Sequence, residues 1–129
     1  ELNYIEPGKN YGWPDIRADE TRDGMVTPVI NAGTSETWAP AGATFVTRGP
    51  WAGSLLFTGL RGQTLYRVVL DSSDARKVEK FERLLYRQFG RLRDIVEGPD
   101  GNLYLLTSNR DGRGSSKDDD DRVIRLSFK

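Results

Sequence analysis

Residues 54–70 read SLLFTGLRGQTLYRVVL, and this stretch decides the fold class. Two apolar and aromatic runs, 54–58 and 64–70, lie on either side of a glycine-rich link. Short apolar runs bounded by glycine predict two paired antiparallel strands. Similar runs at 43–47 and 77–85 predict one more strand on each side. The central part of the chain is therefore predicted to form a four-stranded meander.

The same order of elements begins again after this meander. Candidate strands follow at 92–97, 103–108 and 123–128, and the first two are joined by the turn sequence GPDG at 98–101. A recurring four-stranded meander of about 40 to 50 residues is typical of a β-propeller blade. Periodicity alone also allows a β-sandwich. We predict an all-β chain, a partial β-propeller of about two to two and a half antiparallel blades.

The whole chain is expected to form one propeller fragment rather than several domains. Candidate strands at 2–5 and 26–30 precede the full blade and are predicted to be the last two strands of another blade. Pro28 places the second of these strands at a sheet edge. Because blades need neighbours on both faces, we expect either a homo-oligomer or completion by a missing remainder of the propeller. The predicted parts of residues 1–129 are the end of one blade at 1–30, a full blade at 39–85 and three strands of the next at 90–129.

The composition excludes several classes of function. The 129 residues include 19 Lys+Arg and 19 Asp+Glu, so no net charge favours nucleic acid as a partner. No run of apolar residues is long enough to predict a membrane span. The chain has no cysteine and no histidine, which excludes a disulfide framework and an imidazole base from these residues.

Two polar loops resemble ligand sites on first reading. Residues 117–122 read KDDDDR, but adjacent carboxylates without spaced ligands favour a solvated acidic loop over a calcium loop. Residues 109–114 read NRDGRG, which lacks the Lys-Ser/Thr of a phosphate-binding loop and does not lead into a helix. We expect neither loop to hold a metal or a phosphate.

Several motifs in order resemble the soluble pyrroloquinoline quinone (PQQ)-dependent aldose sugar dehydrogenases, also called the glucose/sorbosone dehydrogenase family. The octet PGKNYGWP at 7–14 is the most specific of them, whereas GPDG occurs in many propellers. The resemblance runs through nearly the whole chain and matches the C-terminal part of such an enzyme. The other matching segments are ELNYI at 1–5, APAGATF at 39–45, LFTGLRG at 56–62, GRLRD at 90–94 and GPDGNLY at 98–104.

The resemblance implies a six-bladed propeller in which PQQ, held over the central channel, accepts hydride from the anomeric carbon of an aldose. Calcium and a histidine base complete that chemistry in the family. The base belongs to an N-terminal half that this sequence does not contain. We therefore expect no catalytic residue here and no activity from this chain alone, with periplasmic or secreted localisation by resemblance.

An arginine pair is the main candidate for the cofactor site. Arg91 and Arg93 are two residues apart, so in a strand both side chains lie on one face and can converge on one anion. By resemblance they match a cofactor-contacting pair that faces the channel. The alternative is that both arginines are simply solvated or salt-bridged.

The resemblance implies four more site residues. Arg61 matches a basic residue placed against the cofactor, with an exposed turn arginine as the alternative. Thr37 matches a cofactor-contacting threonine, although Ser35 replaces the aromatic residue expected upstream, so that Trp38 either substitutes for it or packs. The remaining two, Glu1 and Tyr11, match a second calcium site made of a carboxylate and a backbone carbonyl.

Two functions remain open at this point. One is a fragment of a PQQ-dependent sugar dehydrogenase that supplies arginines to the quinone site. The other is a non-catalytic propeller-like binding or structural module that assembles from several copies.

Overall fold

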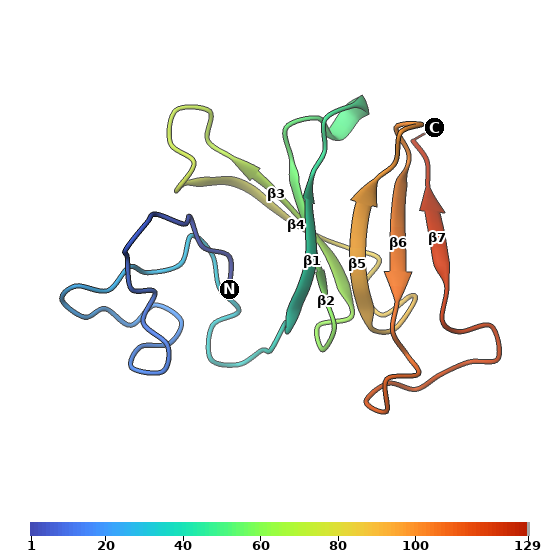
Figure 1. Cartoon of the computed structure of the whole chain (residues 1–129), viewed down its shortest axis with the longest axis horizontal. Helices are drawn as coiled ribbons and strands as arrows, with labels where there is room; N and C mark the ends of the chain where they lie inside the picture. The colour runs from blue at the N-terminus through green and yellow to red at the C-terminus, as the bar shows by residue number, and fades with distance from the viewer. Residues whose placement is uncertain (129) are drawn as a thin grey trace.

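The computed structural model describes residues 1–128, which form an all-β chain with one short 3₁₀ helix. Figure 1 shows two twisted antiparallel sheets side by side, with the N-terminal segment on the far side of the first. The first sheet has the order β1-β2-β3-β4 and the second the order β5-β6-β7. The elements are β1 (Pro40–Phe45), η1 (Gly49–Trp51), β2 (Leu55–Gly59), β3 (Thr64–Leu70), β4 (Val78–Leu84), β5 (Leu92–Glu97), β6 (Leu103–Thr107) and β7 (Val123–Leu126).

Strand β2 lies at the centre of the first sheet and is buried along its whole length. It pairs with β3 in the register Phe57↔Tyr66 and Gly59↔Thr64, across the glycine-rich link. Burial on both faces explains the continuous apolar run of β2, since alternation is expected only where one face meets water. The predicted hairpin and the all-β fold are both confirmed.

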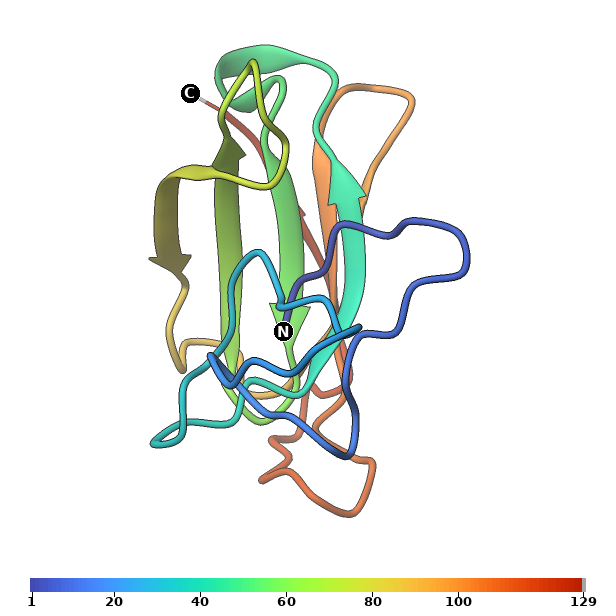
Figure 2. The same cartoon turned by 90° about the vertical axis from the view of Figure 1, so that its left-hand side faces the viewer.

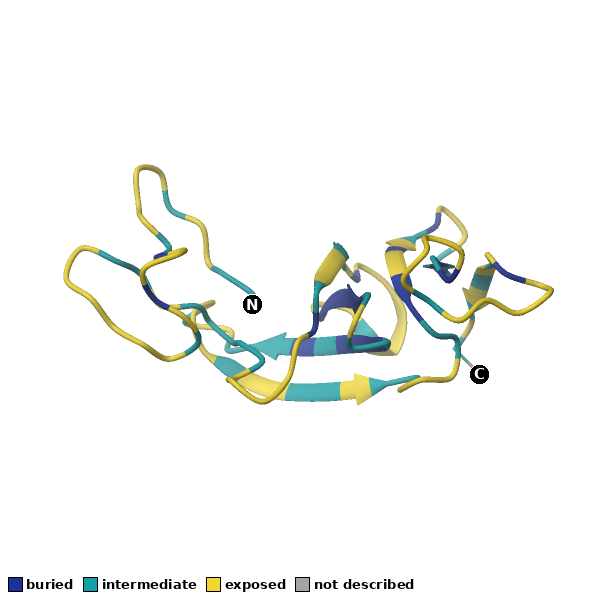
Figure 3. Cartoon of the chain, turned by 90° about the horizontal axis from the view of Figure 1, so that it is seen from below, coloured by how far each residue is buried: buried dark blue, intermediate teal, exposed yellow. Residues whose placement is uncertain are grey.

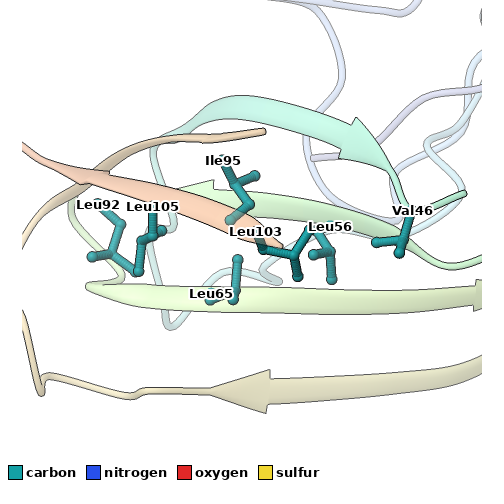
Figure 4. Packing of buried hydrophobic residues seen from close by; sticks show 7 residues of the cluster. All are labelled: Val46, Leu56, Leu65, Leu92, Ile95, Leu103 and Leu105. Carbon is teal, nitrogen blue, oxygen red and sulfur yellow. The ribbon is translucent and has the colours of Figure 1, made fainter. Parts of the chain in front are cut away.

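The core between the two sheets consists of aliphatic side chains. Leu56 and Leu65 project from the first sheet, while Leu92 and Leu105 project from the second, and all four are fully buried. Burying one such side chain stabilises the fold by about 2 kcal/mol. Figure 4 shows the whole cluster between the strands: Val46, Leu56, Leu65, Leu92, Ile95, Leu103 and Leu105.

The opposite face of the first sheet carries aromatic residues. Trp38 packs against Phe57, Tyr66 and Phe81 in tilted arrangements, with ring centroids 5.6, 4.9 and 5.5 Å away, respectively. The N-terminal segment covers part of this face, with Leu2 packed against the cluster. Figure 2 shows this segment crossing the sheet. One face of the first sheet therefore packs against the second sheet, and part of the other face packs against the N-terminal segment.

The N-terminal segment contains fewer strands than predicted. In place of strands at 2–5 and 26–30 the structure has one antiparallel bridge, between Leu2 and Ile30. The strand predictions were wrong because Pro28 lacks an N–H and Ile5 is 71% exposed, so neither run continues the pairing. The β1–β4 sheet lies within 39–85 and the β5–β7 sheet within 90–128, while Lys129 lies outside the described residues.

The inner strands of the two sheets approach each other closely at Gly42. A Cβ atom there would lie 2.7 Å from the Cα of Asp94 on β5 and would overlap the Asp94 carboxylate. Farther along, Glu97 accepts hydrogen bonds from Thr47 N, Thr47 Oγ1 and Arg48 N at 2.8, 2.7 and 3.0 Å. Contact at both ends of β1 fixes the first sheet against the second.

The free face of the second sheet exposes apolar side chains. Val96 and Val123 are 48% and 69% exposed. Figure 3 shows buried residues concentrated in the strands and exposed residues along the loops. Such a face is what a propeller blade presents to its next neighbour. Completion by further copies or by a remainder of the propeller stays a prediction.

The turn at 98–101 offers a test by pH. Asp100 accepts hydrogen bonds from Asn102 Nδ2 at 2.7 Å and Tyr104 Oη at 2.8 Å, which lower its pKa to about 2. A lowered pKa in the folded state means that Asp100 stabilises the fold above its unfolded pKa of about 4, and that this contribution disappears as the pH falls through about 2.

We expect carboxyl NMR titration to give a pKa of about 2 for Asp100 and a higher value in Asn102→Ala, which removes the first hydrogen bond. Asp100→Asn should remove this part of the acid dependence of unfolding. A wild-type Asp100 pKa of about 4 would contradict the geometry of the turn.

Candidate cofactor site

Four loops meet at one end of the two sheets and carry the predicted cofactor residues. Because the strands alternate in direction, the start of β1 and the β2–β3, β4–β5 and β6–β7 loops lie at the same end (Figure 1). Thr37 precedes β1, and Arg61 lies in the β2–β3 loop. Arg91 directly precedes β5, and Arg93 is its second residue.

The arginine pair converges on one carboxylate of the chain itself. Arg91 Nε and Nη2 donate to Asp111 Oδ2 at 2.9 and 2.8 Å, and Arg93 Nη2 donates to the same oxygen at 3.3 Å. Arg93 Nη2 also donates to Ser108 Oγ at 3.0 Å. The two guanidinium groups therefore lie on the same side of the strand, as their spacing predicts. Both are also salt-bridged, which was the alternative reading of the pair.

The two arginines differ in what they can still bind. The side chain of Arg91 is only 10% exposed, whereas that of Arg93 is 47% exposed. The hydrogen bond from Arg91 lowers the pKa of Asp111, so this carboxylate is charged at neutral pH. Asp111 thus holds Arg91 in place while Arg93 keeps donors directed to solvent, where a second anion can bind.

Asn109 fixes the backbone beneath the pair. Its Oδ1 accepts from Arg91 N at 2.8 Å, and its Nδ2 donates to Phe89 O and Asp120 Oδ1, both at 2.9 Å. The side chain is buried, and Gly90, with φ of +72°, leaves the room that it occupies. Asn109 therefore fixes the backbone position of Arg91 just before β5.

The acidic loop at 117–122 is only partly solvated. Asp120 is 9% exposed, and the backbone N–H of Lys117, together with Asn109, lowers its pKa. Asp121 accepts a hydrogen bond from Asn109 N. The prediction of a solvated acidic loop holds for Asp118 and Asp119, whereas Asp120 and Asp121 accept hydrogen bonds from Asn109, which follows the end of β6.

Sequence reasoning missed Asp111, Asn109 and Asp120 as parts of this site. The arginine pair was itself a signal, because two cations on one side of a strand favour a nearby counter-ion, above all for the buried Arg91. The polar run at 109–111 follows a strand that ends at the same edge. Nothing in the spacing, however, distinguishes Asp111 from the other aspartates of the loop.

A polar hollow lies beside the arginine pair. It has a volume of about 290 Å³ and its lining includes Thr37, Arg61, Arg83 and Arg87. Arg91 is linked to the loop that carries Arg61, since its Nη1 donates to Leu60 O at 3.4 Å. Within residues 1–128 Arg61 forms no hydrogen bond or ion pair, so its guanidinium group is available to a ligand.

Trp38 packs in the core rather than lining the cofactor site with an exposed ring. It is 3% exposed, and its Nε1 donates to Glu36 Oε2 at 3.1 Å. Arg83 binds both Glu36 oxygens at 2.9 Å and lowers the pKa of that carboxyl. These contacts hold the loop that carries Thr37.

Glu1 and Tyr11 form separate contacts. Glu1 Oε1 accepts from Asn3 Nδ2 at 3.2 Å, and Tyr11 Oη donates to Tyr4 O at 2.8 Å. Among residues 1–128 no three acidic, histidine or cysteine side chains form a metal-binding group. The calcium assignment for these two residues stays a prediction.

The geometry defines a class of protein. Two antiparallel meanders, packed face to face through their inner strands and with functional side chains at one end, form part of a β-propeller. A sequence model of the Glucose / Sorbosone dehydrogenase family matches residues 1–118, and the chain belongs to this family of PQQ-dependent sugar dehydrogenases. No helix in the described part of the chain is long and apolar enough to cross a membrane.

Three relatives illustrate the similarity. The chain is 32% identical to the aldose sugar dehydrogenase YliI of Escherichia coli (strain K12), over 87% of this chain and 33% of that protein. The structure of the PQQ-bound aldose sugar dehydrogenase from Streptomyces coelicolor matches with a TM-score of 0.78 and 37% identity, over 95% of this chain and 34% of that one.

An oxidoreductase (glucose dehydrogenase) from Thermus thermophilus matches with a TM-score of 0.82 and 41% identity. That match covers 97% of this chain and 35% of the other. The chain therefore spans about a third of the length of these relatives.

Proposed function

We propose that this chain supplies the arginine side of the quinone site of a PQQ-dependent aldose sugar dehydrogenase. The observation that carries the proposal is the pair Arg91 and Arg93, held on one side by Asp111 at the end of the sheets where Arg61 also lies. The PQQ-bound relative from Streptomyces coelicolor supports the choice of ligand.

The residues present fit a planar tricarboxylate. Guanidinium groups bind carboxylates through paired N–H donors, and Arg61 and Arg93 both have donors directed away from the core. Thr37 contributes a hydroxyl group to the same end. When bound, PQQ would accept a hydride, which carries two electrons, from the sugar.

The chain's own residues then act by binding and by electrostatics. Arg93 and Arg61 would neutralise carboxylates of the cofactor, and Arg91 would add a third positive charge that favours the negatively charged, reduced quinone. Asp111 keeps Arg91 oriented without removing its charge. No residue here offers a histidine base, so proton removal from the sugar is assigned to another part of the protein.

Calcium at Glu1 and Tyr11, periplasmic or secreted localisation and an aldose substrate complete the proposal by resemblance. Two oxygen ligands are fewer than the six to eight that calcium takes, and no step of the mechanism is derived through this ion. The non-catalytic alternative, assembly from several copies, rests on the exposed face of β5–β7 and is distinguished by the solution mass of the chain.

The decisive substitution is Arg93→Gln, because this side chain is exposed and its loss leaves the Arg91–Asp111 pair intact. A charged hydrogen bond is worth about 1.5–3 kcal/mol, so PQQ should bind about 10- to 100-fold more weakly in a fluorescence titration. Arg125→Gln, which removes an equal charge from β7, should change the affinity less than about twofold. Equal affinities of all three proteins would contradict the proposal.

A further inference from the structure

The hollow next to the arginine pair contains more positive charge than the proposed quinone contacts use. Three guanidinium groups, of Arg61, Arg83 and Arg87, line it against one carboxylate, that of Glu36, which leaves an excess of two positive charges. Only Arg83 is neutralised, by its two hydrogen bonds to Glu36. An excess of cations in a hollow attracts an anion.

Arg87 is held in an orientation suited to binding. Its guanidinium group stacks on the ring of Tyr86, with the Cζ atom 5.0 Å from the centroid. Stacking occupies the face of the guanidinium plane and leaves the N–H groups at its edge free to donate. No hydrogen bond or ion pair uses these groups in residues 1–128. Arg87 therefore presents a fork of donors that lacks an acceptor.

Hydroxyl groups form the floor of the hollow. Thr64 and Tyr66 are 1% and 2% exposed, and both line it. The Tyr66 hydroxyl lies directly under Gly62, where a Cβ atom would overlap it. Burial raises the pKa of Tyr66, so this group stays a neutral donor at physiological pH. Thr64 Oγ1 already donates to Gly62 O at 2.7 Å, so the Tyr66 hydroxyl is the neutral donor that a carboxylate can use beside the guanidinium groups.

Strained backbone occurs at Arg87 in the lining of the hollow and at three residues that are next to lining residues in the sequence. Ala39, Gln63, Leu85 and Arg87 have φ values of 46°, 49°, 55° and 56°, in the left-handed region that side chains other than glycine rarely adopt. These four are among the five such non-glycine residues in the described chain. Strained residues of this kind gather at functional sites, where the surrounding structure maintains them.

Backbone hydrogen bonds connect these strained loops into one frame. Leu60 N donates to Ala39 O at 3.0 Å, and Arg87 N donates to Gln63 O at 2.8 Å. The frame joins the segment before β1, the β2–β3 loop and the β4–β5 loop. A hollow whose walls are joined in this way is preformed, which reduces the entropy lost when a ligand binds.

We propose that this hollow is a carboxylate-binding site in which Arg87 supplies the free donors, with Arg61 shared between it and the quinone site and Arg83 paired with Glu36 in its wall. Its volume of about 290 Å³ is at the lower end of small-molecule pockets and suits a ligand of monosaccharide size. The carboxylate can come from an acidic sugar or from the cofactor itself. Neither source changes the residues that bind it.

The test is an NMR titration of the chain with glucuronate, with glucose as the uncharged comparison. Glucuronate should bind at least about fivefold more tightly than glucose and shift the signals of Arg87 and Tyr66. Arg87→Asn should weaken glucuronate binding about fivefold without loss of stability, because asparagine accepts a positive φ. Arg113→Asn removes an equal charge from the neighbouring β6–β7 loop and should have no effect.

Repeating the titration with PQQ separates the two sources. If glucuronate still binds when PQQ is present, the hollow takes the carboxylate of a separate acid. If PQQ prevents glucuronate binding and Arg87→Asn weakens PQQ binding, the bound carboxylate belongs to the cofactor. Equal binding of glucose and glucuronate, or equal loss in Arg113→Asn and Arg87→Asn, would overturn the proposal. Arg93→Gln reports on the quinone site alone, so failure of the proposed function is recognised independently.

Discussion

Replacing Gly42 with alanine is expected to destabilise the chain by about 3 kcal/mol or more, an unusually large effect for one methyl group. The added Cβ would lie 2.7 Å from the backbone Cα of Asp94, which no side-chain rotation can relieve. Strand β1 would have to move away from β5. The sheets would then lose part of the packing that both Val46 and Ile95 provide.

Urea unfolding followed by tryptophan fluorescence measures this effect. Ala41→Ser, on an exposed position of the same strand, should change stability by less than about 0.5 kcal/mol. A Gly42→Ala protein with wild-type stability would show that the two sheets do not meet as described. Because the sheets present the site together, the same variant should also weaken PQQ binding.

Replacing Asn109 with alanine should cost about 3 kcal/mol or more and should loosen the arginine pair. The change leaves Arg91 N, Phe89 O and Asp120 without the partner that the buried amide supplies. Each buried polar group left unpaired costs about 1–3 kcal/mol. The backbone of Arg91 would no longer be held in place by this hydrogen bond, so the affinity for PQQ should fall together with the stability of the fold.

Asn31→Ala is the matched control for this prediction. Asn31 also donates to a carboxylate, Asp19, at 2.8 Å, but that contact is exposed. Its loss should cost less than about 1 kcal/mol, because water replaces the partner. Similar losses in both variants, measured by urea unfolding, would refute the role assigned to Asn109.

The alternation and spacing of apolar residues were sufficient to predict both sheets. Strand order and hairpin register depend on local sequence, and runs such as 64–70 carry that information. The strands predicted at 2–5 and 26–30 failed because an apolar run forms a strand only when a partner is available along its length. Within residues 1–128, the pairing between these two runs is limited to the bridge from Leu2 to Ile30.

The candidate site was predictable only where its residues are close in sequence. The two-residue spacing placed Arg91 and Arg93 on one side, and the structure shows this directly. Their counter-ion, Asp111, is 18 or more residues away and reaches them through a loop without regular structure. The hollow at Arg87 forms where three chain segments meet. Their contact in space could not be predicted from any one of these segments.

The most direct measurement is an NMR titration of the chain with PQQ that follows the arginine side-chain N–H signals. We predict saturable shifts for Arg61, Arg91 and Arg93, at the end of the sheets where β5 begins. Arg48, at the opposite end, and Arg125, on β7, should not respond. Shifts confined to Arg48 or Arg125, with none at the three site arginines, would contradict the proposed quinone site.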